Sequence, residues 1–287
     1  MRNRDVTDLP RAHLSYWRYG FTEKKGGIVM AYAATFNRIE KKYLLQQQQY
    51  QGVMDALQLH LQPDAFPRSV VTSLYWDTSS NDIISRSLEK PLYKEKLRVR
   101  RYSGLQANGA LAPSGGCVFV ELKKKFKGVV YKRRLSMVED GARAWLSGMD
   151  FQQACALFHL VGKDSAAPTT HEQQVAREIE AFMARNPEAC PAMITRCVRT
   201  AWKDPQSQLR ITFDSPIQAG RPAGDPFLMQ LDGRALDLLE PGRVLMEVKQ
   251  VGGLPPWLRK VLSTNKIYPQ SFSKYGTAFQ MEAEKEF

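Results

Sequence analysis

Charged and apolar residues alternate along several segments of the chain. Lys96, Arg98 and Arg100, for example, alternate with Leu97 and Val99. Successive side chains of a β-strand point to opposite faces, so such a segment predicts a strand with one charged and one apolar face. We predict eight strands, over residues 37–43, 70–78, 95–102, 116–124, 128–136, 193–203, 207–214 and 242–250.

Helical periodicity appears between some of these strands. Apolar residues recur at intervals of three and four residues over 47–61, 151–161, 171–185 and 255–264, which predicts amphipathic helices. The apolar stripe of each helix needs a surface to cover, and the apolar faces of the strands provide one. Helices that cover those faces from outside would leave the charged faces of the strands pointing inward.

Eight strands are enough to close a small barrel whose interior holds side chains or one ligand. We therefore predict an α+β fold, a closed eight-stranded antiparallel β-barrel with flanking helices. Residues 30–287 are predicted as a single domain, with a helical insertion at about 139–187. Residues 1–29, which end near the linker-like run at 24–27, are predicted to be a flexible N-terminal tail.

Composition limits the class of protein. Hydrophobic residues make up 43% of the chain and charged residues 24%, as in soluble globular proteins. No apolar run approaches the ~20 residues of a transmembrane helix. The beginning of the chain does not resemble a signal peptide. Four widely spaced cysteines indicate neither a zinc site nor a disulfide framework, so we expect reduced thiols and a cytoplasmic location.

The net charge of +12 predicts an anionic partner, which could be nucleic acid, a membrane surface or a phosphorylated small molecule. Segment 94–134 contains twelve basic residues and two acidic ones. A basic tail would be polar and of low complexity, whereas this segment alternates with apolar residues. Most of the excess charge is therefore predicted to lie on the sheet.

The motif Glu-x-Lys occurs three times, at Glu40/Lys42, Glu121/Lys123 and Glu247/Lys249, and each pair shares one face of a predicted strand. An ordinary antiparallel sheet with its charged face in solvent would also alternate in this way. Arginine-rich faces, the repeated motif and the amphipathic helices together favour convergence on an enclosed channel. Asp77 and Asp214 are interpreted as partners of the arginines or as caps at strand ends.

Eight short motifs of charged and apolar residues follow one another along the chain. They are Arg38-Ile39-Glu40-Lys41-Lys42-Tyr43, Ser73-Leu74-Tyr75-Trp76-Asp77-Thr78, Lys96-Leu97-Arg98-Val99-Arg100, Val120-Glu121-Leu122-Lys123, Lys132-Arg133-Arg134, Arg210-Ile211-Thr212-Phe213-Asp214, Met246-Glu247-Val248-Lys249 and Ser271-Phe272-Ser273-Lys274-Tyr275-Gly276. Over residues 36–280 the chain thereby resembles the catalytic domain of the vacuolar transporter chaperone (VTC) polyphosphate polymerases, which are triphosphate tunnel metalloenzymes.

The resemblance implies a tunnel that binds a triphosphate or polyphosphate chain and a divalent metal, Mn²⁺ or Mg²⁺. It implies transfer of the γ-phosphoryl group of ATP to a growing polyphosphate chain. The residues that it places at the reaction centre are Arg98, Arg100, Lys123, Arg199, Arg210 and Glu247. Those that it assigns to phosphate binding are Lys42, Lys132, Arg134, Lys249, Ser273 and Lys274. It makes Glu247 the main metal ligand, with Glu40 and Glu121 as weaker candidates.

One departure from the related thiamine-triphosphatase type is informative. That type carries Glu-x-Glu-x-Lys near the N-terminus, whereas this chain has a single carboxylate, Glu40, in the stretch from Arg38 to Lys42. The difference favours the VTC-like branch.

Three functions are compatible with the pattern. The favoured one is a metal-dependent polyphosphate polymerase that uses ATP. The alternatives are a tripolyphosphatase or nucleoside triphosphatase with the same tunnel, and a non-catalytic polyphosphate-binding module. The chain lacks a P-loop motif, and no nucleic-acid partner is expected because Lys124 faces away from Lys123 and Lys125. The sequence fixes neither the oligomeric state nor a peripheral membrane partner.

Overall fold

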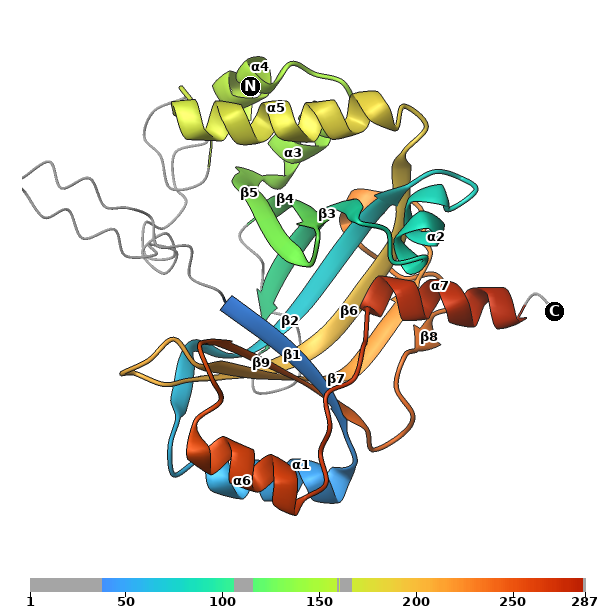
Figure 1. Cartoon of the computed structure of the whole chain (residues 1–287). Helices are drawn as coiled ribbons and strands as arrows, with labels where there is room; N and C mark the ends of the chain where they lie inside the picture. The colour runs from blue at the N-terminus through green and yellow to red at the C-terminus, as the bar shows by residue number, and fades with distance from the viewer. Residues whose placement is uncertain (1–37, 106–115, 159, 161–166, 286–287) are drawn as a thin grey trace, which may run out of the picture.

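The computed structural model describes residues 38–105, 116–158, 160 and 167–285. Its central element is a curved antiparallel sheet. Its strands are β1 (Arg38–Leu45), β2 (Gln62–Asp77), β3 (Tyr93–Gly104), β4 (Cys117–Phe126), β5 (Val129–Val138), β6 (Cys190–Lys203), β7 (Arg210–Gly220), β8 (Leu236–Asp237) and β9 (Val244–Val251). Eight of them lie side by side in the order β1-β9-β7-β6-β2-β3-β4-β5, and the short β8 pairs with β7 (Figure 1).

Helices occupy the connections between the strands. They are α1 (Gln47–Leu57), α2 (Asp82–Leu88), α3 (Glu139–Leu146), α4 (Phe151–Phe158), α5 (Thr170–Arg185), α6 (Pro256–Thr264) and α7 (Lys274–Lys285). Three of them, α3, α4 and α5, follow one another between β5 and β6, where the sequence pattern predicts a helical insertion. Of the helices described, none is both long and apolar enough to cross a bilayer.

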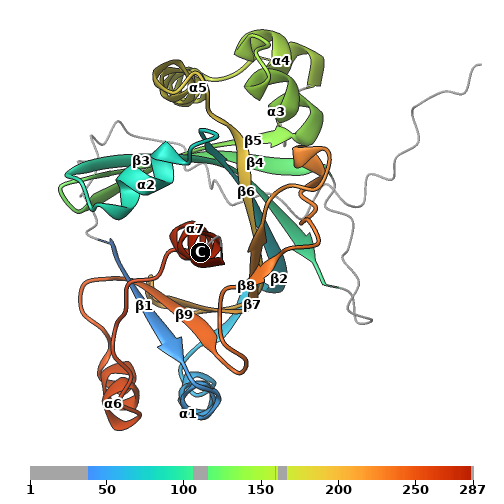
Figure 2. The same cartoon turned by 90° about the vertical axis from the view of Figure 1, so that its right-hand side faces the viewer.

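The helices cover the apolar, outer face of the sheet. Leu97, Leu122 and Leu135 of the β3–β5 region share one buried cluster with Ile179 and Phe182 of α5. At the other end of the sheet, a second cluster joins apolar residues of β1, β7 and β9 to α1 and α6. Figure 2 shows these two helical layers on opposite sides of the molecule, with the concave face of the sheet between them. The predicted orientation, apolar faces outward under helices and charged faces inward, is confirmed.

The prediction of a closed barrel is wrong, because the sheet is open. In the described chain no strand pairing joins β1 to β5, so these two strands form the edges. Like charges on the facing edges provide a physical reason, because closure would bring the cations of β1 towards those of β4 and β5. Desolvation lowers the pKa of Lys123 on β4, and across the gap Glu40 of β1 raises it while Lys42 of β1 lowers it, so the charges of the two edges already interact.

Helix α7 lies within the curve of the sheet (Figure 2). The ring of Tyr275 stacks on Tyr75 of β2 with 4.9 Å between centroids. The Tyr275 hydroxyl donates a hydrogen bond to Asp77 at 2.6 Å. Asp77 also accepts the backbone N–H groups of Ile83 and Ile84 in the first turn of α2, at 2.8 and 2.9 Å. Asp77 therefore caps α2 and anchors α7, the structural role that the sequence allowed for it.

Helices α2 and α7 are not among the predicted helices. Helix α2 has seven residues, too few for a clear period. Helix α7 contains Gly276, where an added Cβ would lie 3.1 Å from Leu88 Cδ2 of α2, so the absence of a side chain permits this close packing. β2 begins at Gln62, eight residues before its predicted start. The predicted tail, residues 1–29, lies outside the described residues.

Removal of the Asp77 carboxyl group should destabilise the fold. Asp77→Ala leaves buried backbone and hydroxyl donors of α2 and α7 without an acceptor, so we expect the free energy of unfolding to fall by about 3–5 kcal/mol. Tyr275→Phe removes one of these bonds and should cost about 1 kcal/mol. Urea denaturation followed by circular dichroism measures both, with the exposed Asp237→Ala as a matched control. Equal stability of the Asp77 and Asp237 variants would contradict this role.

Candidate functional site

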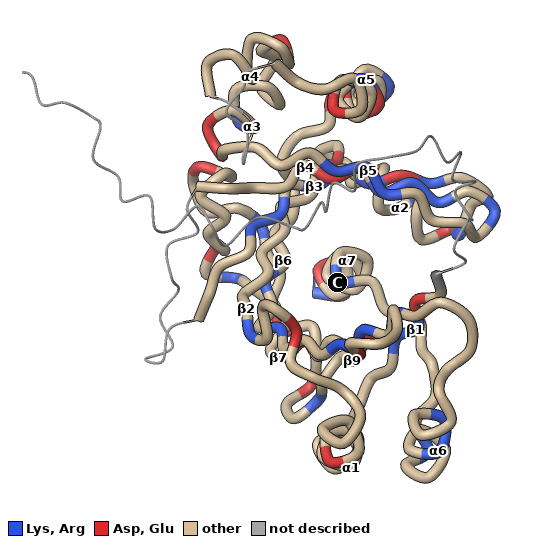
Figure 3. The backbone as a smooth tube through the Cα atoms, turned by 90° about the vertical axis from the view of Figure 1, so that its left-hand side faces the viewer, with Lys and Arg blue, Asp and Glu red and all other residues tan. Residues whose placement is uncertain are grey.

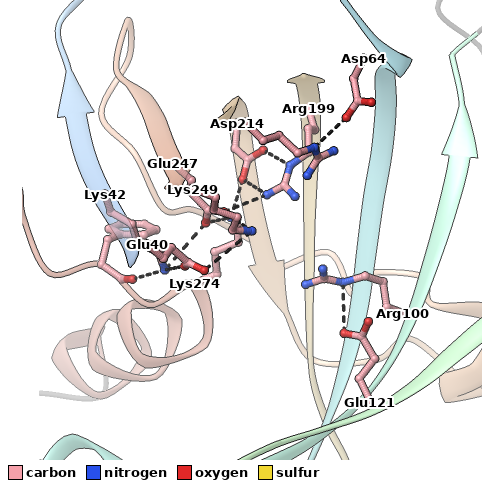
Figure 4. A network of polar contacts seen from close by, with 12 residues as sticks. Glu40, Lys42, Asp64, Arg100, Glu121, Arg199, Asp214, Glu247, Lys249 and Lys274 are labelled. Carbon is pink, nitrogen blue, oxygen red and sulfur yellow. Dashed lines mark hydrogen bonds and ion pairs between the residues drawn. The ribbon is translucent and has the colours of Figure 1, made fainter. Parts of the chain in front are cut away.

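Two groups of charged side chains face each other across the concave face of the sheet. The Glu121 cluster comprises Arg98, Arg100, Glu121, Lys123, Lys132 and Arg134, all from β3, β4 and β5. The Glu247 cluster comprises Glu40, Lys42, Arg199, Asp214, Glu247, Lys249 and Lys274, from β1, β6, β7, β9 and the start of α7. Figure 3 shows Lys and Arg along the strands on both sides of α7, and Figure 4 shows the Glu247 cluster at close range with Arg100 and Glu121 of the other cluster.

Strand register builds the Glu121 cluster. Arg98 lies opposite Glu121, which in turn lies opposite Arg134. Arg98 Nε and Nη2 donate to Glu121 Oε2 at 2.8 and 2.7 Å, and Arg134 Nε donates to Oε1 at 2.6 Å. Lys132 Nζ lies 2.7 Å from the same Oε1. The Glu121 side chain is only 1% exposed, so a single buried carboxylate of β4 orients cations from the two neighbouring strands, β3 and β5.

Two tyrosines extend this cluster. Arg98 Nη1 donates to the Tyr75 hydroxyl at 3.2 Å, and Arg100 Nη1 donates to the Tyr102 hydroxyl at 3.3 Å. Burial alone would raise the pKa of both phenols, but the adjacent guanidinium groups lower the pKa of Tyr75 to about 8 and that of Tyr102 to about 7. The pKa values of the tyrosines thus report a strongly positive local potential.

Two lysines on this side of the concave face, Lys132 and Lys96, also have lowered pKa values. Desolvation, with repulsion from Arg134 and Arg98, lowers the pKa of Lys132 to about 8 against the opposite effect of Glu121. Desolvation, with repulsion from Lys94 and Lys123, lowers the pKa of Lys96 to about 8 against the opposite effects of Tyr75 and Asp77. Both ammonium groups remain mostly charged at pH 7 and lose protons above about pH 8, and a polyanion would stabilise their charged forms.

The Glu247 cluster is built around Arg199 and Asp214. Arg199 Nε and Nη2 donate to the two Asp214 oxygens, each at 2.6 Å, in a bidentate pair at the centre of the sheet. Lys274 Nζ donates to Asp214 Oδ2 at 2.6 Å. Asp214 is fully buried, which agrees with its interpretation as a partner of the arginines. This pair fixes the guanidinium plane and ties α7 to the sheet.

Glu247 lies among four cations without a short hydrogen bond to any of them. Arg199 Nη2, Lys249 Nζ, Lys274 Nζ and Lys42 Nζ lie 3.5, 3.6, 3.6 and 3.8 Å from its oxygens. Burial alone would raise the pKa of Glu247, but the surrounding cations hold it well below its usual range. Glu40 is within 3.9 Å of Lys42 and 3.7 Å of Lys249, so it shares two of these lysines with Glu247.

The two clusters differ in their balance of charge. Among the residues described, the Glu121 cluster has five cations and one carboxylate, and four of these cations lie within 4.0 Å of Glu121. The Glu247 cluster has four cations, Lys42, Arg199, Lys249 and Lys274, and three carboxylates, Glu40, Asp214 and Glu247. The Glu121 cluster therefore favours anions such as phosphate groups strongly, whereas the Glu247 cluster combines cations with carboxylates.

The carboxylates of the Glu247 cluster fit a divalent metal better than Glu121 does. In the part of the chain that the structure describes, no group of three or more His, Cys, Asp or Glu side chains could hold a metal by itself. Mg²⁺ commonly takes one or two carboxylates and completes its shell with substrate phosphates and water. Glu247 and Glu40 fit such a shared site, whereas Arg98, Lys132 and Arg134 occupy the oxygens of Glu121.

A pocket of about 360 Å³ opens beside the Glu247 cluster. It is lined by Glu40, Lys41 and Lys42 of β1, by Lys125 of β4 and by residues 269–272. A second pocket of about 290 Å³ lies in the outer helical layer, between α3 and α5, and its charged lining residues are Asp150 and Glu180. Only the first has the cations that a phosphate requires, so we take it as one opening of the concave face.

The structure brings most of the predicted site residues together, with two differences. Arg210 shares the inner face but donates to Asp64 at 2.6 Å, at the margin of the Glu247 cluster. Ser273 Oγ accepts the backbone N–H of Gly276 at 3.2 Å, so in this state Ser273 caps α7. Lys124 pairs with Glu178 on the outer face, as its predicted orientation requires.

The predicted set lacks Tyr75, Tyr102, Lys96 and Asp64. Alternation could have found Tyr102 and Lys96, because they lie two residues from Arg100 and Arg98, on the same face of β3. Tyr75 lies opposite Arg98 in the register of β2 and β3. Asp64 lies between Pro63 and Arg68, where the register of β2 with β6 shifts, so alternation does not place it.

Comparison with solved structures finds low similarity over most of the chain. A protein of Pyrococcus horikoshii OT3 is 11% identical, with a TM-score of 0.41, covering 86% of this chain and 99% of its own. A candidate adenylate cyclase of Bacillus halodurans is 11% identical (TM-score 0.44; 82% and 93% covered). A candidate adenylate cyclase of Vibrio parahaemolyticus is 9% identical (TM-score 0.38; 84% and 96% covered). These TM-scores are too low to support an argument about activity.

Comparison with sequence families is decisive. No curated protein matches the chain. The family model of the VTC domain matches residues 37–282, which include the charged strands of both clusters and most of α7. The chain therefore belongs to the VTC domain family.

Proposed function

We propose that this protein is a metal-dependent polyphosphate polymerase that transfers the γ-phosphoryl group of ATP to a growing polyphosphate chain. The observation that carries the proposal is the concave face, where cations from six strands and one helix face a common space. A polyphosphate carries about one negative charge per phosphate, so a row of fixed cations matches it along its length. Membership of the VTC domain family supports the same substrate class.

The Glu121 cluster is suited to holding the polyphosphate or triphosphate chain. Arg98 and Arg134 are held by Glu121, and Arg100 donates to Ser73 Oγ at 3.1 Å, so these guanidinium groups are oriented before a substrate arrives. Phosphoryl transfer depends mainly on alignment and charge neutralisation. Pre-oriented donors supply both without the energetic cost of rearrangement.

The Glu247 cluster is suited to the reacting phosphates and a metal. Lys42, Lys249, Lys274 and Arg199 would bind phosphate oxygens, and Glu247 with Glu40 would hold Mn²⁺ or Mg²⁺. When bound, the metal would neutralise charge on the β- and γ-phosphates. Under this proposal no protein nucleophile is needed, because the terminal phosphate of the chain attacks.

Purified protein incubated with ATP and Mn²⁺ should form long-chain polyphosphate, resolved by size on a gel, and ADP. Release of short phosphates without chain growth would assign the site to a tripolyphosphatase or nucleoside triphosphatase instead. Binding of polyphosphate without turnover under any divalent metal would assign it to a binding module.

Glu247→Gln should reduce turnover at least ~100-fold, because it removes the main metal ligand but keeps the side-chain size.

Glu178→Gln is the matched control for this substitution. Glu178 also holds two cations, Lys124 and Arg133, at 2.8 and 2.9 Å, but on the outer face. It should change turnover less than twofold by our estimate, about the scatter expected for a remote site. Thermal unfolding and polyphosphate binding verify that both variants fold. Equal loss of turnover in the two variants would contradict the assignment of Glu247.

Glu121→Gln should separate a positioning role from metal binding. Loss of the carboxylate leaves Arg98, Lys132 and Arg134 without their counter-charge, so we expect the free protein to lose about 2 kcal/mol of stability. Added polyphosphate should restore more stability in this variant than in the wild type, because it replaces the missing anion. The Mn²⁺ concentration for half-maximal turnover should stay within about twofold of the wild type. A large rise, as expected for Glu247→Gln, would make Glu121 a metal ligand.

Polyphosphate affinity should fall as the pH rises from 7 to 9. Lys96 and Lys132 are charged below their pKa of about 8 and lose that charge above it, while Tyr75 and Tyr102 become anionic over the same range. All four changes make this side of the concave face less positive, so the dissociation constant for long-chain polyphosphate should rise about tenfold or more at constant ionic strength. Lys132→Arg should flatten the profile, because a guanidinium does not titrate here. A pH-independent affinity would contradict this prediction.

A further inference from the structure

The turn between β4 and β5 and the start of β3 form an exposed end of the sheet. Six large apolar side chains are exposed there, and we call them the apolar tip: Leu92, Tyr93, Phe126, Val129, Val130 and Tyr131. Leu92 is 72% exposed, and the others are between 46% and 50% exposed. The tip includes nearly half of the exposed large apolar residues in the described structure, so it is a concentrated patch and not scattered exposure.

Strand pairing makes one row of the patch continuous, whereas Val130 lies opposite Lys125 on the other face of the hairpin. Tyr93 lies opposite Phe126, and Phe126 lies opposite Val129, so these three share one row across β3, β4 and β5. The backbone N–H of Lys127 donates to the Leu92 carbonyl at 2.9 Å, which holds the turn against the start of β3. Helix α5 meets the sheet further along, where Glu178 pairs with Lys124, and leaves this row uncovered.

Lysines surround the apolar tip. The side chains of Lys90, Lys125 and Lys127 make no hydrogen bond or ion pair with other described residues, although Lys127 Nζ lies 5.4 Å from the centre of the Phe126 ring. Desolvation lowers the pKa of Lys94, and repulsion from Lys125 and Lys90 lowers it further. We call Lys90, Lys94, Lys125 and Lys127 the lysine fringe, a group of closely spaced positive charges. Of the nearby acids, Glu95 is engaged by Arg185 and by the Tyr93 hydroxyl, and Glu89 is exposed.

We propose that the apolar tip docks onto an anionic lipid bilayer. Tyrosine rings are suited to the membrane interface because they have an apolar body and a polar end, and Phe126, Leu92 and Val129 supply apolar area. Lysines beside such a patch are attracted by anionic headgroups. Lys90, Lys125 and Lys127 have the position and charge for this contact.

The same charges disfavour a second copy of this chain as the occupant. A two-fold contact through the tip would bring the lysines of both copies together. Headgroups of anionic lipids instead supply charge of the opposite sign over a flat surface.

Docking through the tip has a consequence for the concave face. Lys125 belongs both to the lysine fringe and to the pocket of about 360 Å³ beside Glu40 and Lys42. The docked protein would therefore present this opening to the membrane surface. This consequence rests on the proposed function, whereas the docking itself does not.

Co-sedimentation of the full-length chain with vesicles tests the docking. We expect binding to vesicles of phosphatidylcholine and phosphatidylserine and weaker binding to phosphatidylcholine alone. The double variant Leu92→Ser/Phe126→Ser should bind the anionic vesicles about tenfold more weakly or worse, because apolar contact area is lost. Lys125→Gln/Lys127→Gln should bind them more weakly by about fivefold per lysine. The control Leu59→Ser/Leu157→Ser, which removes exposed leucines elsewhere, should bind like the wild type.

Unchanged thermal unfolding and polyphosphate binding would verify that the Leu92→Ser/Phe126→Ser variant is folded. Equal vesicle binding by this variant and the wild type would attribute the binding to the concave face and overturn the proposal. Absence of vesicle binding by the wild type would overturn it as well. A wild-type dimer in sedimentation velocity that the variant abolishes, without vesicle binding, would assign the tip to self-association instead. The proposed activity is assayed without vesicles, so failure of the docking leaves it untouched.

Discussion

Repulsion among the cations of the concave face is the constraint on which the rest of the structure depends. Strands in a sheet lie about 4.8 Å apart, so arginines and lysines on neighbouring strands are forced together once they share a face. Buried carboxylates make this arrangement possible, because Glu121 of β4 holds cations of β3 and β5, and Asp214 binds Arg199 and Lys274. The remaining positive charge is not neutralised within the described protein, because the Glu121 cluster alone has five cations and one carboxylate.

The outer helical layers and the open edges both follow from this charge distribution. Because the inner face is charged, the apolar faces of the strands point outward and need α1, α5 and α6 to cover them. The edges β1 and β5 bring cations towards the same gap, so a polyanion between them would act as the missing counter-ion. Binding would then relieve repulsion that folding has already fixed in place, and it would require little movement of Arg98 or Arg199.

Local alternation explains why the strands and their faces could be predicted from the sequence, since Leu97, Leu122 and Val248 lie in the buried clusters as expected. The prediction of closure failed because pairing of β1 with β5 depends on contacts far apart in sequence, which local patterns do not contain. α7 was missed for a similar reason, because Tyr75, Asp77 and Leu88 hold it in place more than its own polar pattern does. Within the site, the Glu-x-Lys motifs located the clusters, but the pairing of Arg210 with Asp64 needed three-dimensional information.

The two clusters differ in their ratio of cations to carboxylates, so the two sides of the concave face are not equivalent for a phosphate chain. A phosphate chain along the Glu121 cluster meets cations with little competing negative charge, whereas near Glu247 it meets Glu40 and Glu247 as well. Those carboxylates repel phosphate unless a divalent cation lies between them, so under the proposed function a metal and the most highly charged phosphates would lie together at that end. Under the proposed function, placement of the reacting phosphates near β1 and β9, and of the rest of the phosphate chain along β3 to β5, would therefore minimise unpaired charge on both sides.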